Sequence, residues 1–166
     1  MRIWSSAHDG GAVHAMGNGQ MLAYGRGPEL AYLYGPPYSS PSLARMELVP
    51  DAPLNDHAQR LPGGAIWRHT LIDAASHVPV ALMTECVHHE LPVYLRRWEE
   101  VARPLRWRIH LHPSATLLPA SRHEGAWLVM LKPGAPIYHY PAAHWSWGLF
   151  LTEGACRLEA ADDGTL

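Results

Sequence analysis

Histidine is the residue type that most readily suggests chemistry in this sequence, because the 166 residues include 12 of them. Imidazole changes its charge near neutral pH and is a common metal ligand, so acid/base and metal chemistry are both open to it. The sharpest pair is His110 and His112, two residues apart. On a β-strand this spacing places both rings on one face, where they could bind the same ion.

A metal site of the cupin type would add a carboxylate and a later histidine to that pair. Glu124 and His144 are the residues that would complete it. The spacing argues against such a site, because a proline-containing loop separates His112 from Glu124 where a short glycine-bounded turn is needed. Scattered histidines are more often surface or hydrogen-bonded core residues. We therefore predict no metal and no cofactor, and keep His110, His112, Glu124 and His144 as the alternative.

The other reactive residues give weaker indications of a catalytic or metal-binding site. His88 and His89 are adjacent, so we expect them to point to opposite faces of a strand. Neither Cys86 nor Cys156 has a neighbouring base in the sequence that would mark it as a nucleophile. We expect both thiols to be reduced and to carry no chemistry, and their distance from each other stays open. The sequence predicts no catalytic residue in this segment.

Aromatic side chains are the second group that could bind a ligand. Trp145 and Trp147 share one strand face, and Tyr38 lies in the proline-rich loop at 35–41. Sugar rings stack on flat apolar surfaces of this kind, although core packing is the more common use of aromatic residues. Because prolines restrict the loop, Tyr38 would be held at a site with little loss of entropy on binding. We predict oligosaccharide contacts at Tyr38, Trp145 and Trp147.

Short apolar runs separated by glycine and proline recur along the chain, which is typical of an all-β sandwich or barrel. The 15 prolines leave few windows for a long helix. The clearest hairpin has Gly17, Asn18 and Gly19 as its turn, where a positive φ is cheap. The expected strands are 12–16, 20–24, 29–34, 43–49, 65–72, 78–86, 93–101, 105–112, 126–132, 135–140, 145–152 and 156–160. We predict an antiparallel β-sandwich of about ten or more strands, incomplete at the C-terminus.

Two segments need a separate decision. Residues 50–64 contain Pro50, Pro53 and Pro62, and we expect them to form the longest connection and the most mobile segment. In residues 91–103 the apolar side chains also fall at helical spacing. We predict a strand there because the neighbouring segments are strand-like, and a helix stays the alternative.

Charge and hydropathy exclude several classes of partner. With 13 Lys+Arg against 15 Asp+Glu, the net charge of -2 gives no broad basic surface for nucleic acid. No stretch approaches the roughly 18 apolar residues of a membrane span, and no signal peptide precedes the first strand. We expect one cytoplasmic domain over 1–166, without a nucleic-acid or membrane partner.

Two stretches resemble a known family. The sequence NGQML at 18–22, followed by the strand at 29–34 and GPPY at 35–38, resembles the opening of the N-terminal β-sandwich domain of glucoamylase-like glycoside hydrolases. Residues 83–98, which include VYLRR at 93–97, resemble a strand, turn and strand of the same domain. The resemblance covers most of the chain and indicates an architecture better than a substrate.

The resemblance implies a non-catalytic domain in a carbohydrate-active protein. In that family the catalytic glutamates lie in a C-terminal helical barrel, so no catalytic residue transfers to this chain. The expected partners are such a barrel in the same chain and an oligosaccharide, and the chain would be the N-terminal part of a longer glycosidase. The resemblance also favours a strand within 91–103. Two alternatives stay open, a cupin-like metal-binding β-barrel protein and a stand-alone β-sandwich interaction module.

Overall fold

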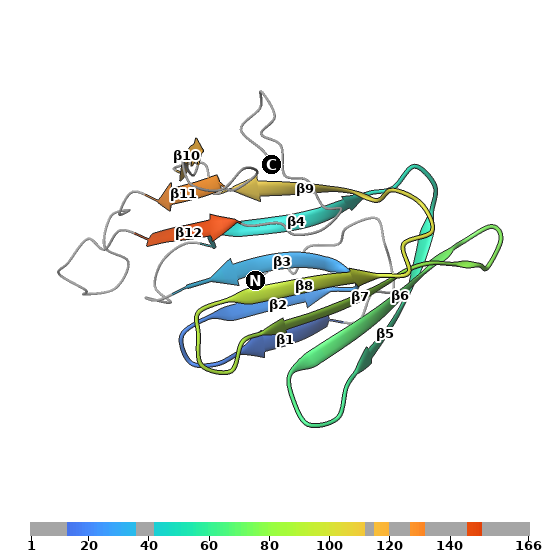
Figure 1. Ribbon diagram of the computed structural model, residues 1–166, viewed down its shortest axis with the longest axis horizontal. Coiled ribbons are helices and arrows are strands. Elements are labelled where there is room, and N and C mark those ends of the chain that lie inside the picture. The colour runs from blue at the N-terminus through green and yellow to red at the C-terminus, as the bar shows by residue number, and fades with distance from the viewer. Residues whose placement is uncertain (1–12, 36–41, 112–114, 120–126, 132–145, 151–166) are drawn as a thin grey trace.

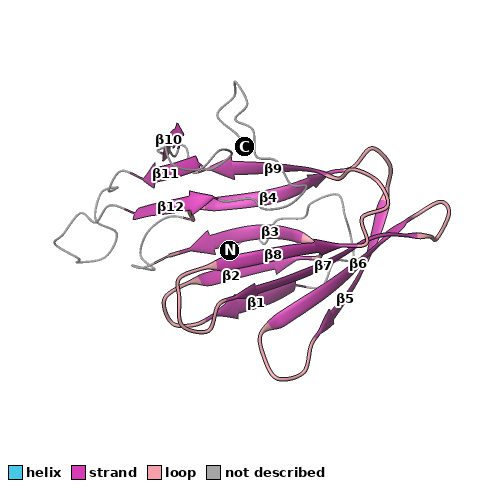
Figure 2. Cartoon of the chain, viewed as in Figure 1, coloured by secondary structure: helices cyan, strands magenta, loops and turns pink. Residues whose placement is uncertain are grey.

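The computed structural model describes residues 13–35, 42–111, 115–119, 127–131 and 146–150. These residues form strands and no helix (Figure 2). The strands are β1 (Val13–Gly17), β2 (Leu22–Arg26), β3 (Glu29–Tyr34), β4 (Ala44–Val49), β5 (Leu54–Arg60), β6 (Ile66–Asp73), β7 (Pro79–Val87), β8 (Tyr94–Glu99), β9 (Arg106–Leu111), β10 (Ala115–Pro119), β11 (Trp127–Leu131) and β12 (Ser146–Phe150).

Two antiparallel sheets carry most of the structure, in the orders β1-β2-β3-β4-β9 and β5-β6-β7-β8. Strands β10, β11 and β12 form a third antiparallel sheet. Figure 1 shows β7 and β8 lying across β1, β2 and β3, and side chains from the two layers are in contact. The predicted all-β, antiparallel sandwich architecture is therefore confirmed.

The first hairpin follows directly from its local sequence. His14 and Met16 face inward on β1, and the residues that alternate with them, Val13, Ala15 and Gly17, are exposed, as a half-buried strand requires. At the turn, Gly19 has a φ of 85°, which glycine adopts without strain. The Asn18 side chain accepts hydrogen bonds from the backbone N–H groups of Gln20 and Met21 at 2.8 and 2.9 Å. The predicted hairpin is confirmed, with its turn at residues 18–21: Asn18 and Gly19 are in the turn as predicted, whereas Gly17 belongs to β1.

The core lies between the two main sheets. Its centre is a cluster of buried apolar side chains on β1, β2, β3 and the residue before β4: Met16, Ala23, Leu30, Leu33 and Leu43. Trp67 of β6 and Val87 of β7 pack against this cluster from the opposite sheet. Burial of these side chains holds the sheets together without any directional bond.

Residues 50–64 are not one long connection, so that prediction is wrong. Strand β5 occupies the middle of this region and pairs with β6 along its whole length. It lies at the edge of its sheet, and its alternate residues Asn55, His57 and Gln59 are exposed. An edge strand with one solvent-exposed face carries few apolar residues. Pro53 and Pro62 lie just outside β5. The segment therefore lacks the hydrophobic pattern that marks the other strands.

Residues 94–99 form strand β8, so the predicted strand in this region is confirmed. Pairing with β7 decides the matter, because tertiary partners outweigh the helical spacing of the apolar residues. His88 and His89, however, do not point to opposite faces of a strand. They follow β7 in a turn, and their rings stack with centroids 4.6 Å apart. The ring of His88 accepts hydrogen bonds from the N–H groups of Glu90 and Leu91, which fixes this turn.

Some predictions concern residues beyond those described. The strands expected at 135–140 and 156–160 lie outside them, as does Cys156. Cys86 is half-buried and its thiol is free. Strand β10 was not expected from the sequence. The part of the chain that the structure describes contains no helix able to cross a membrane.

Candidate metal centre between the two sheets

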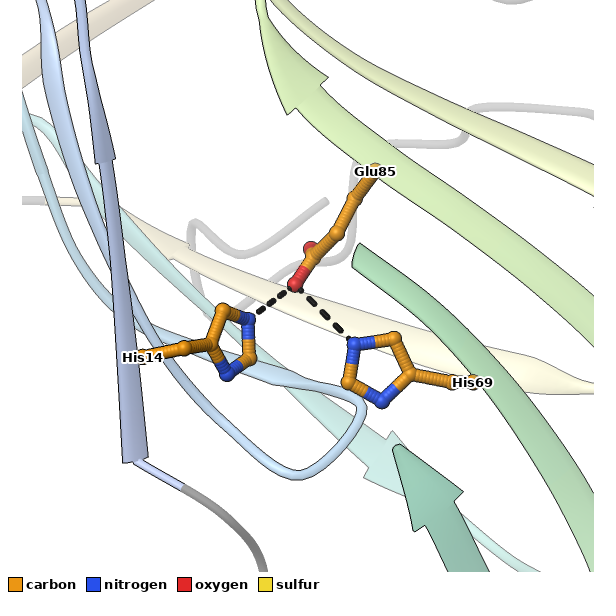
Figure 3. A group of neighbouring side chains, drawn as sticks. All are labelled: His14, His69 and Glu85. Atoms are coloured by element: carbon orange, nitrogen blue, oxygen red, sulfur yellow. Dashed lines mark hydrogen bonds and ion pairs between the residues drawn. The ribbon is translucent and has the colours of Figure 1, made fainter. Parts of the chain in front are cut away.

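Three buried side chains converge between the sheets: His14 of β1, His69 of β6 and Glu85 of β7 (Figure 3). Their exposed fractions are 4%, 0% and 0%. One nitrogen of each histidine and one carboxylate oxygen lie within 4.8 Å of one another. His14 comes from the five-stranded sheet, while His69 and Glu85 come from neighbouring strands of the other sheet. The cluster therefore exists only because the two sheets pack face to face.

Strand register brings His69 and Glu85 together. His69 is directly opposite Met83, and Glu85 is directly opposite Trp67. The two polar residues are therefore diagonal neighbours on the inward face of one antiparallel pair, within reach of long side chains. Met83 is fully buried on the same face, which confirms that this face is the interior one.

The His14 ring occupies space that Gly25 leaves open. Gly25 is the residue opposite His14 in the pairing of β1 with β2. A Cβ atom at position 25 would lie closer than 3.0 Å to Nε2 and Cε1 of the His14 ring. On its other sides the ring meets Trp67, with centroids 4.6 Å apart, and His69, with centroids 5.3 Å apart. The position of His14 is therefore determined by its neighbours and by a missing side chain.

Glu85 uses its two oxygens in different directions. Oε1 accepts a hydrogen bond from Nε2 of His14 and lies 3.3 Å from Nε2 of His69. Oε2 accepts hydrogen bonds from the Tyr94 hydroxyl and from Nε of Arg96, the latter at 3.1 Å. Burial by itself would raise the pKa of Glu85, but the two neighbouring histidines and the Arg96 charge hold that pKa well below its usual range. Glu85 is therefore an ionised carboxylate inside the sandwich.

Asp56 of β5 contacts the His69 ring at Nδ1, on the side away from Glu85. The Nδ1 atom of His69 lies 3.0 and 3.2 Å from the two Asp56 oxygens, so it donates its proton there. Burial lowers the pKa of His69, but Asp56 and Glu85 outweigh it and raise the pKa to about 8. Nε2 then faces the cluster, where it has no partner with hydrogen-bond geometry. A histidine whose Nδ1–H is held by a carboxylate is the usual arrangement of a metal ligand.

Arg96 of β8 balances the buried negative charge. Its guanidinium lies 5.5 Å from the ring centroid of Tyr94 and 5.1 Å from that of Trp107. Burial, together with the Glu85 charge, raises the pKa of the Tyr94 hydroxyl, which therefore stays protonated and donates to Glu85. Both groups act on Oε2 only. Oε1 is left to the two histidines.

The donor set of two imidazoles and one carboxylate suits a divalent transition metal. Two ligand atoms on a tetrahedral zinc ion are roughly 3.3 Å apart, if each bond is about 2.0 Å. The 3.3 Å between His69 Nε2 and Glu85 Oε1 matches this spacing. His14 and Glu85 are joined directly by a proton, so metal binding would replace that proton and separate the two atoms. The cluster is almost completely buried, so an organic substrate could not reach its three ligand atoms.

The predicted site residues lie elsewhere. His110 is on β9, where its Nε2 is 2.8 Å from Glu47 of β4. It alternates with the buried Ile109 and so faces away from the sandwich interior. Trp147 belongs to β12, where its backbone is opposite Met130. The other predicted residues lie outside those described: Tyr38, His112, Glu124, His144 and Trp145. Among the predicted residues whose side chains the structure describes, His110 does not belong to the cluster.

The sequence did contain a signal for the missed site. Glu85 is in phase with Ala81 and Met83, which are buried on β7, so the burial pattern of this strand places a carboxylate in the core. A buried carboxylate is rare unless it is paired. Searching for its partners among in-phase histidines would have led to His69, which alternates with Leu71 on β6 in the same way. The identity of His14 as the third member required the structure.

Comparisons of this chain with protein-family models, with curated proteins and with solved structures find no match. The site has to be interpreted from its own geometry.

Proposed function

We propose that this β-sandwich binds a divalent transition metal ion through His14 Nε2, His69 Nε2 and Glu85 Oε1. The observation that carries the proposal is the convergence of three buried ligand atoms from both sheets. Support comes from Asp56, which orients His69, and from Tyr94 and Arg96, which orient Glu85. Such outer partners are expected around a metal site and set the direction of each ligand.

Zinc is the ion that fits this donor set best. Magnesium and calcium prefer oxygen ligands, whereas two imidazoles and one carboxylate are ligands that zinc accepts. The chemistry that zinc supplies in such a setting is the polarisation of a bound oxygen atom or the joining of structural elements. Because the three ligands are buried, joining of elements is the role that the site favours.

A metal-binding β-protein was one alternative from the sequence, although with other residues. The carbohydrate role rests on the sequence resemblance, and it stays a prediction together with the helical barrel partner and the cytoplasmic location. The test for that role is oligosaccharide binding by Trp145→Ala and Trp147→Ala variants. Unchanged binding of every tested sugar by folded variants would refute it.

Zinc binding by the purified chain tests the proposal. After removal of metal with EDTA and desalting, zinc is titrated against a competing chromophoric chelator. We expect about one equivalent of tightly bound zinc. Replacing His69 by Ala should lower the zinc affinity by at least about tenfold, because it removes one of the three ligands, the one that the Asp56 carboxylate orients. Circular dichroism shows whether each variant has kept its β-structure.

A matched control separates this site from surface binding. The double variant His88→Ala/His89→Ala removes two adjacent histidines outside the cluster, of which His89 is 79% exposed, and should bind zinc as the unchanged chain does. If the folded chain binds less than about a tenth of an equivalent, the proposal is wrong. It is equally wrong if the double variant, and not the His69 variant, loses the zinc.

A further inference from the structure

Strand β1 reaches the cluster from the edge of its sheet. It is the first strand in the order β1-β2-β3-β4-β9, so β2 is its one pairing partner in the described part of the chain. The side chain of His14 crosses from this strand to Glu85 in the other layer. A strand paired on one side is more easily released than a central strand, because fewer backbone hydrogen bonds hold it.

The β1–β2 hairpin has a second polar attachment at its tip. Nδ2 of Asn18 donates to the backbone oxygens of His88 and Leu91 at 2.7 and 2.8 Å. Nε2 of Gln20 donates to the backbone oxygen of Glu90 at 3.1 Å. These bonds join the tip to the turn between β7 and β8. Asn18 is four residues from His14, which is roughly 13 Å along a strand, so the two attachments are separate.

Of these two attachments, only the one at His14 would change when metal binds. His69 and Glu85 lie on neighbouring strands of one sheet, so an ion held by these two residues alone would stay within that sheet. Adding His14 joins the ion to the other sheet. The hydrogen bond between His14 and Glu85 is thereby replaced by metal–ligand bonds that join the two layers.

Resting on the proposed metal binding, we infer that the ion is a clasp that controls how often the β1–β2 hairpin opens from the four-stranded sheet. With metal bound, opening of the hairpin requires the loss of a ligand. Without metal, the interactions that hold the hairpin include the His14–Glu85 bond, the tip contacts, the pairing of β2 with β3 and the apolar packing of Met16 and Ala23. Opening exposes the core around Leu30 and Leu33, so the clasp regulates exposure of apolar surface.

Hydrogen exchange of the full chain, followed by mass spectrometry, tests the clasp. The chain is compared in EDTA and at a free zinc concentration about 100 times its dissociation constant. Amides of residues 13–26 should exchange at least about tenfold more slowly with zinc, with roughly 100-fold as the upper limit when the open hairpin does not bind the ion. Amides of β4, which β2 and β3 separate from β1 in their sheet, should change little.

Two variants refine the test. In His14→Ala the zinc ligands of the four-stranded sheet remain, and zinc should no longer protect residues 13–26. In Asn18→Ala the tip is loosened without a change in any ligand, so exchange in EDTA should be faster, and the ratio of the rates without and with zinc should stay about the same.

The outcomes separate the clasp from the binding site itself. If zinc binds at about one equivalent but exchange of residues 13–26 is unchanged, the clasp is wrong and the metal site stands. Equal protection of every strand would also overturn the clasp, because it indicates general stabilisation. If no zinc binds to the folded chain, both proposals are overturned.

Discussion

Replacing Gly25 by Ala perturbs the cluster without altering any ligand. The new Cβ would lie closer than 3.0 Å to Nε2 and Cε1 of His14, and 3.1 Å from its Cδ2. The ring has little freedom to move, because Trp67 and His69 lie on its other sides and Glu85 binds its Nε2. Either the ring leaves its place or β1 and β2 separate locally. Both responses disturb the geometry of the metal ligands.

The expected loss of stability follows from overpacking. Inserting one methyl group into a tightly packed interior typically costs about 1–3 kcal/mol. Alanine in place of glycine also reduces the freedom of the unfolded chain, which offsets roughly 0.4–1 kcal/mol. We therefore expect Gly25→Ala to lower the free energy of unfolding by about 1–2 kcal/mol in EDTA, and to weaken zinc binding as well.

Urea unfolding in EDTA measures the effect, with Gly64→Ala as the matched control. A Cβ at position 64 meets only Ile66, at 3.5 and 3.7 Å, which is ordinary contact. The double variant His14→Ala/Gly25→Ala should show coupling of about 0.5–3 kcal/mol, because removal of the ring frees the space for the new methyl group. If Gly25→Ala is as stable as Gly64→Ala, or if its effect adds independently to that of His14→Ala, the packing argument is refuted.

Three further predictions concern the charges around the cluster. Glu85→Gln should lower the free energy of unfolding by about 3–5 kcal/mol, because the Arg96 charge would remain buried without its carboxylate partner. Urea unfolding measures this loss, and a value below about 1 kcal/mol would contradict the prediction. Asp56→Ala should weaken zinc binding by about 10–100-fold in the chelator competition, since Nδ1 of His69 loses its orienting acceptor. In metal-free protein the pKa of His69 is about 8 in the folded state against 6.5 as its ordinary value, so its protonation stabilises the fold fully below pH 6.5. That contribution, about 2 kcal/mol, should disappear as the pH rises through 8. Urea unfolding between pH 6 and 9.5 should show it in the unchanged chain and to a smaller extent in Asp56→Ala, where Glu85 remains.

Much of the fold was predictable from local sequence. The first hairpin, the alternation in β9 and the antiparallel all-β architecture follow from turn residues and from a period of two in hydrophobicity. Strand β5 was not predictable in this way. Its exposed face and its place at a sheet edge remove the apolar pattern, and the prolines around it suggest a loop.

The candidate site was only partly encoded in local patterns. The inward phase of Glu85 on β7 places a carboxylate in the core, but the sequence alone does not give this phase, because both faces of β7 carry apolar residues. Its partners cannot be identified from the sequence either, because any inward-facing polar residue of another strand could neutralise it. Histidine spacing favoured His110 and His112, since two ligands on one strand are the arrangement that a sequence can display.

By itself, then, the sequence determined the first hairpin and most of the strands, because these depend on neighbours within a few positions. The tertiary structure decided which inward-facing residues meet. His14 and Glu85 are 71 positions apart, and they touch because two sheets stack with β1 over β7. Gly25 becomes significant only through its register with His14 on the neighbouring strand. Sheet packing and strand register are long-range properties, and the chemistry of this cluster depends on both.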